Sequence, residues 1–85
     1  MDTLKITTEY ITLQQLLKIE DIISSGGEAK YFLANNQVFV NNEPENRRGR
    51  KLYPNDVIKV SGKEFKIEWL KILNYLILEN LIVLI

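Results

Sequence analysis

The residues of this chain that are most suited to chemistry stand in one short run, Arg47-Arg48-Gly49-Arg50-Lys51. The run places four positive charges in five residues and contains no acid. The chain has 11 Lys and Arg against 11 Asp and Glu, so removing those four leaves seven basic and eleven acidic residues, a balance of −4. A local cationic segment on an otherwise acidic chain is suited to contacting a phosphate backbone. The alternative is a solvated loop that only keeps the protein soluble, which is the commoner role of a charge run.

The rest of the composition argues against catalytic and metal chemistry. There is no Cys, which excludes disulfides and thiolate metal sites. There is no His, which removes the usual acid or base at neutral pH and the commonest metal ligand. No cluster of Asp and Glu indicates a magnesium site made of carboxylates alone. We therefore expect no enzyme activity, no cofactor and no metal.

The elements that must position the basic run can be predicted from hydrophobic periodicity. Eighty-five residues make one small domain. Alternation predicts a first strand over residues 4–11. Thr12, with Gln15 three residues later, forms a capping-box pattern that opens a helix over residues 13–20. A second helix follows the Ser24-to-Gly27 segment and covers residues 27–35.

The second half of the chain predicts strands and turns. Residues 37–41 alternate as a strand, and residues 43–50 form a polar loop that contains most of the basic run. A turn at Pro54 leads into strands over residues 57–60 and 64–68, which form a hairpin. The expected fold class is α+β, with two short helices packed on a small, mostly antiparallel, curved sheet.

Four segments between residues 12 and 60 together resemble a known family. They are Thr12 to Lys18, Ser25 to Lys30, Val38 to Asn41 and Asn55 to Val60. Their order and spacing are similar to the RNA-binding domain of ribosomal small-subunit protein four, the S-four (S4) domain. Gly26 to Lys30 together with Glu45 to Leu52 look like the stand-alone, bacterial YaaA-like branch.

The resemblance implies RNA binding, to ribosomal or ribosome-associated RNA, along a surface shared by the second helix and the loop. Carried over by position, the helix contributes Lys30 and the loop contributes Arg47, Arg48, Arg50 and Lys51. Relatives often carry a Ser-Arg pair and a further basic residue in this helix, where this chain has Gly26-Gly27 and Tyr31. Lys30 is therefore the helix's only cation, and the loop must supply most of the electrostatic affinity.

Three further residues are secondary candidates for RNA contact. Gly27 stands at a helix start, where free N–H groups bind anions, although a tight connection between two helices explains the Gly pair equally simply. Tyr31 and Tyr53 could stack on bases. By periodicity Phe32 belongs to the core and Tyr31 does not.

Two turn positions that relatives usually fill with Gly are Asn42 and Asn55 in this chain. Asn is the next best residue at positive φ, so we expect both turns to be kept.

The C-terminal segment, residues 69–85, is an apolar extension beyond the domain of residues 1–68. It is too short and too polar for a membrane span, so we expect no membrane contact. It could pack on the sheet, form a homodimer interface or remain peripheral. A protein-interaction adaptor that uses this extension is therefore the alternative to RNA binding. The start of the chain does not resemble a signal peptide, so the cytoplasm is the expected location.

Overall fold

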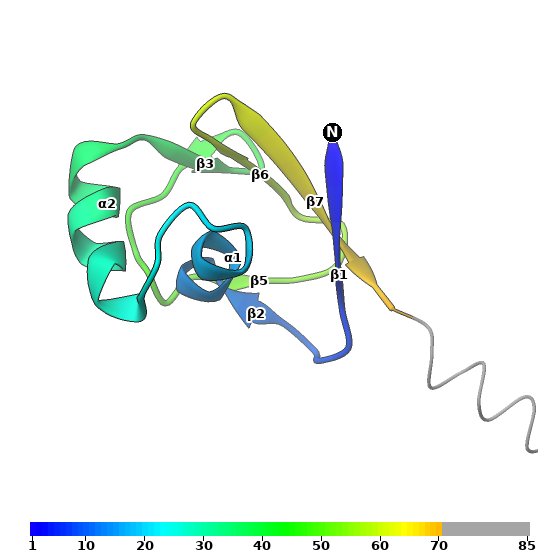
Figure 1. The fold of residues 1–85 in the computed structure, drawn as a ribbon. Coiled ribbons are helices and arrows are strands. Elements are labelled where there is room, and N and C mark those ends of the chain that lie inside the picture. Colours follow the sequence, from blue (N-terminus) through cyan, green and yellow to red (C-terminus); the bar gives the residue numbers. More distant parts are fainter. Residues whose placement is uncertain (71–85) are drawn as a thin grey trace, which may run out of the picture.

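The structure, a computed structural model, describes residues 1–70 of the chain. In this part the chain forms, in order, β1 (Asp2–Ile6), β2 (Ile11–Thr12), α1 (Leu13–Ile19), the 3-10 turn η1 (Gly26–Glu28), α2 (Ala29–Asn35), β3 (Val38–Val40), β4 (Glu43–Pro44), β5 (Lys51–Leu52), β6 (Val57–Val60) and β7 (Lys63–Trp69). Both helices lie on the same side of the main sheet (Figure 1).

The strands form a five-stranded sheet and a separate two-stranded ladder. The sheet has the order β1-β7-β6-β3-β4, in which β1 is parallel to β7 and the other pairs are antiparallel. The ladder joins β2 to β5. This arrangement confirms the predicted α+β class with two short helices and a mostly antiparallel sheet.

The first predicted strand is wrong in its extent. It was expected to continue through residues 4–11, but β1 ends at Ile6 and a bend leads to β2. Both Ile6 and Ile11 are buried. A continuous strand would place residues five apart on opposite faces, because side chains alternate. The bend resolves this conflict and moves Ile11 to a different partner, Leu52.

The capping box predicted at the start of α1 is confirmed. The Gln15 N–H donates to Oγ1 of Thr12, and the Thr12 N–H donates to Oε1 of Gln15. The helix then buries three leucines against the sheet, Leu13, Leu16 and Leu17. The second helix begins two residues later than predicted, since Gly26–Glu28 form the 3-10 turn η1.

The predicted Asn turns are also confirmed. Asn42 has a φ of 68° and Asn55 a φ of 79°, so both occupy the left-handed region. Asn41 joins the two turns: its Oδ1 accepts from the Val57 N–H, and its Nδ2 donates to Oδ1 of Asp56. Asn has a short polar side chain and therefore tolerates the left-handed region better than most residues, which is why it can occupy both turn positions.

Candidate nucleic-acid interface

The basic loop is fixed to the first turn of α1 through its backbone. The Arg50 carbonyl accepts from the Leu13 N–H at 2.8 Å, and the Arg48 carbonyl accepts from the Gln14 N–H at 2.9 Å. The first N–H groups of a helix have no partner within the helix. Here the loop satisfies two of them, and Thr12 satisfies the next. The carbonyls of the basic run are therefore held in place by α1.

Glu45 holds the side chains of the same loop. It is only 8% exposed, and its carboxylate lies against two guanidinium groups. Oε1 accepts from Nη2 of Arg47 at 2.9 Å and from Nη1 of Arg50 at 2.8 Å. Oε2 accepts from Nε of Arg47 and from the backbone N–H groups of Asn46 and Arg47. One buried acid therefore orders the loop from residue 45 to residue 50.

These contacts lower the pKa of Glu45 from 4.5 to about 2. The largest cause is the side-chain hydrogen bond from Arg47; burial opposes it, and the bond from Arg50 adds to it. The same contact raises the pKa of Arg47. Glu45 is thus ionised at neutral pH, and it compensates part of the charge of the basic run.

The four loop cations differ in their surroundings. Arg48 and Lys51 are exposed, and no carboxylate within residues 1–70 forms an ion pair with either. Arg47 pairs with Glu45 yet keeps 71% of its side chain exposed, whereas the Arg50 side chain is 33% exposed. Arg48 and Lys51 are therefore the most available cations of the run.

Lys51 also lies on an aromatic pair. Its Nζ is 4.8 Å from the centroid of the Tyr10 ring. The Tyr10 ring is tilted by 49° against the Tyr53 ring, with 5.7 Å between centroids. These are distances at which cation–π and aromatic contacts stabilise. Tyr53, together with Arg47, Gly49, Arg50, Lys51 and Asp56, lines an open hollow of about 540 Å³.

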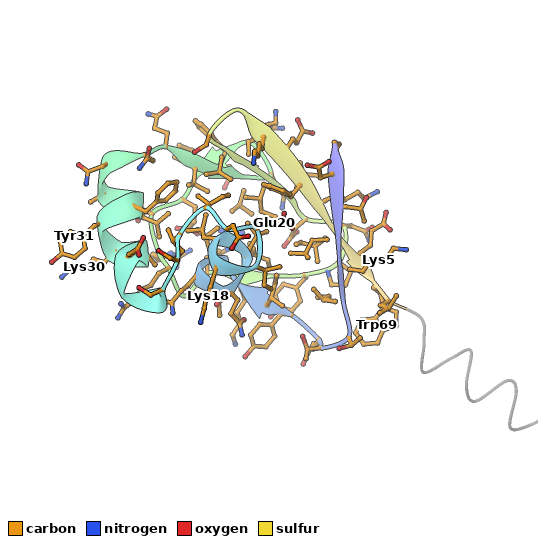
Figure 2. All side chains as sticks on the ribbon, in the orientation of Figure 1. Lys5, Lys18, Glu20, Lys30, Tyr31 and Trp69 are labelled. Carbon is orange, nitrogen blue, oxygen red and sulfur yellow. The ribbon has the colours of Figure 1, made fainter. Side chains whose placement is uncertain are left out.

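The α2 candidates stand apart from this cluster. Lys30 and Tyr31 project outward from α2 (Figure 2), and Gly27 is exposed in η1. No hydrogen bond or ion pair within the described residues joins Lys30 to the loop. The loop approaches α2 at the other end of the helix, where residues 44–46 and residues 33–38 line a hollow of about 380 Å³. The loop thus extends from the C-terminal end of α2 to the N-terminal end of α1.

Sequence reasoning missed two residues of this arrangement. Glu45 stands two positions before Arg47, and that proximity was the available signal for an ion pair. Tyr10 was assigned only to a strand, because nothing local predicts that it meets Tyr53.

The fold and the loop define a small α+β domain that presents fixed cations. A family model described as "S4 domain" matches residues 4–68. The "Probable ribosome maturation protein RlbA" of Bacillus subtilis (strain 168) is 58% identical over 59 residues, which cover 69% of this chain and 83% of that protein. No solved structure matches the chain. The chain belongs to the S4 domain family, which confirms the resemblance, and its stand-alone relative agrees with the YaaA-like branch.

The apolar extension falls largely outside the described residues. Only Trp69, the last residue of β7, and Leu70, whose N–H donates to the Ile6 carbonyl at 2.8 Å, belong to the described part. The predicted packing or dimer contact of residues 71–85 lies outside it and stays a prediction. Within residues 1–70, no helix is long and apolar enough to cross a membrane.

Proposed function

We propose that this domain is a non-catalytic module that binds structured RNA, ribosomal or ribosome-associated, through its basic loop and α2. Arg47, Arg48, Arg50 and Lys51 supply the loop contacts, and Lys30 supplies the contact from α2. Gly27, Tyr31 and Tyr53 are secondary contacts. Membership of the S4 family and the relative named as a ribosome maturation protein support the class of target. A role at the ribosome agrees with the expected cytoplasmic location.

The observation that carries the proposal is the fixed loop. A guanidinium has five N–H donors. Glu45 accepts from two donors of the Arg47 guanidinium and from one donor of the Arg50 guanidinium. Three donors of Arg47 and four donors of Arg50 therefore remain. An arginine held by a carboxylate on one edge presents its other edge to a phosphate, and its planar fork suits two phosphate oxygens. The ion pairs with Glu45 therefore orient these side chains without using up their donors.

The loop is also held in place by contacts within the protein. Its carbonyls are bonded to α1, and its carboxylate anchor is buried. A loop that is already ordered loses less conformational entropy on binding than a mobile one. This property distinguishes the run from a solvated charged segment.

Salt dependence of binding tests the proposal. Fluorescence anisotropy with a labelled ribosomal RNA hairpin should give a slope of about −3 to −4 in log K against log salt for four or five phosphate contacts. The double variant Arg48→Ala, Lys51→Ala should reduce the steepness of that slope by about two, since each phosphate contact adds roughly one. Lys63→Ala is the matched control, because Lys63 is an exposed lysine at the start of β7. It should leave the slope unchanged.

Two results would overturn the proposal. One is the absence of binding at low salt. The other is a salt slope that the Arg48→Ala, Lys51→Ala pair changes no more than Lys63→Ala does.

A further inference from the structure

The aromatic pair beside the basic loop is placed by the β2–β5 ladder. In that ladder Ile11 faces Leu52 and Thr12 faces Lys51. Continuing the same antiparallel register by one position brings Tyr10 opposite Tyr53. Lys51 is then the diagonal neighbour of Tyr10 on the same face, which is where long side chains reach an aromatic ring. The observed contacts of Tyr10 with Tyr53 and with Lys51 agree with this geometry.

The ladder and the following turn make this group rigid. Ile11 and Leu52 are both buried in the core directly next to the two tyrosines. The Tyr53 N–H donates to Oδ2 of Asp56 at 2.8 Å, and the Asp56 N–H donates to the Tyr53 carbonyl. The ring of Tyr53 therefore extends from a backbone that is held on both sides.

Internal packing does not use all of the Tyr53 ring. Its side chain is the one aromatic at the hollow of about 540 Å³, and the residue is 41% exposed. The contact between Tyr10 and Tyr53 explains how the aromatic pair stabilises the ladder, but it does not explain why an open hollow lies beside Tyr53. The hollow is within the size range of small-ligand sites, ~300–1,000 Å³. Its lining combines an aromatic face with the cations Arg47, Arg50 and Lys51.

We propose that the hollow beside Tyr53 binds one unpaired nucleotide of the RNA, with the base stacked on Tyr53 and a neighbouring phosphate on the cations of the loop. This inference rests on the proposed function and names the form of RNA that the site takes. A base within a duplex is covered by its neighbours, whereas a bulged or terminal base exposes a face that can stack on an aromatic ring.

The charges around the hollow favour one orientation of that nucleotide. Arg47, Arg50 and Lys51 stand on the loop, while Asp56 is the single acid among the lining residues. The Asp56 carboxylate already accepts from the Tyr53 N–H and from Nδ2 of Asn41. Its negative charge repels a phosphate. The phosphate therefore lies toward the loop and the base toward Tyr53 and Asp56.

The test compares two RNA hairpins that differ in one nucleotide. One is fully paired, and the other carries a single 2-aminopurine bulge, whose fluorescence is quenched when it stacks. Stacking on an aromatic side chain should make the bulged hairpin bind about 5- to 100-fold more tightly. Tyr53→Ala should remove both the preference and the quenching. Tyr53→Phe should keep both, since it retains the ring.

Tyr53→Leu separates stacking from packing, because leucine fills space without an aromatic face. It should bind the bulged hairpin as weakly as Tyr53→Ala while losing less thermal stability than Tyr53→Ala does. Equal affinity for the two hairpins, or quenching that survives in Tyr53→Leu, would overturn the inference and leave the proposed function standing. If neither hairpin binds, both fail.

Discussion

Replacing Glu45 by glutamine should loosen the basic loop and destabilise the domain. The carboxylate accepts five hydrogen bonds, three of them from guanidinium groups. Glutamine has nearly the same shape, but its amide turns a second set of donors toward the arginines. Removing one partner of a fully buried pair costs ~3–5 kcal/mol. Since the Arg47 side chain is mostly exposed, solvent screens part of this loss, and we expect about 1–2 kcal/mol.

The pH dependence of that loss has a defined sign. The pKa of Glu45 is lowered from 4.5 to about 2 in the folded protein, chiefly by the hydrogen bond from Arg47. A group whose pKa is depressed by folding stabilises the fold above its unfolded pKa and loses that contribution as the pH falls through the folded value. The difference between the wild type and Glu45→Gln should therefore be complete above pH 4.5 and should close as the pH falls toward 2.

Urea unfolding followed by circular dichroism measures this difference. With a slope of ~1 kcal/mol per M of urea, the loss corresponds to a midpoint lower by about 1–2 M at pH 7. Glu43→Gln is the matched control, because Glu43 is an exposed glutamate in β4, two residues earlier. It should shift stability by less than ~0.5 kcal/mol. Equal midpoints for Glu45→Gln and Glu43→Gln would refute the reasoning. So would a difference between the wild type and Glu45→Gln that stays constant down to a pH of roughly 2.5, which lies between the folded and unfolded pKa values.

Two smaller predictions concern the backbone around the loop. Thr12→Ala removes the capping box of α1 and should lower the free energy of unfolding by ~1 kcal/mol in the same assay; an unchanged midpoint would contradict the role assigned to the cap. Asn55 has a φ of 79°, so Asn55→Ala should cost ~1 kcal/mol while Asn55→Gly costs nothing or stabilises. If both Asn55 variants lose equal stability, the side chain rather than the conformation matters there.

Local patterns were enough to predict much of this fold. Thr12 and Gln15 specify the start of α1 by direct reciprocal bonding, so a stretch of four residues contains the whole signal. The positive φ of Asn42 and Asn55 was expected because relatives usually have Gly at these turn positions and Asn is the next best residue there. The charges of Arg47 to Lys51 likewise needed no fold to be noticed. Each of these features depends on residues that are close in sequence.

Apart from Glu45, whose partners are close in sequence, the features that were missed depend on distant partners. The first strand ends at Ile6 because the two ends of the predicted strand pair with different strands. Ile6 lies opposite Trp69 of β7, whereas Ile11 lies opposite Leu52 of β5. The alternation of apolar residues along residues 4–11 does not indicate which strand each residue pairs with. The contact of Tyr10 with Tyr53 follows from the register of β2 on β5, which only the fold sets.

Glu45 changes how the basic run contributes to binding. The basic run together with Glu45 has a net charge of +3, whereas the run alone has +4. The ion pairs with Glu45 also hold the long, flexible side chains of Arg47 and Arg50 in fixed directions. Each immobilised side chain would otherwise cost ~0.5–1.5 kcal/mol on binding, whereas one surface charge contributes a contact that salt weakens. Glu45 therefore weakens the long-range attraction of the loop for RNA but orders the site before the RNA binds. Neutralising Glu45 should weaken binding to RNA although it raises the net charge of the protein.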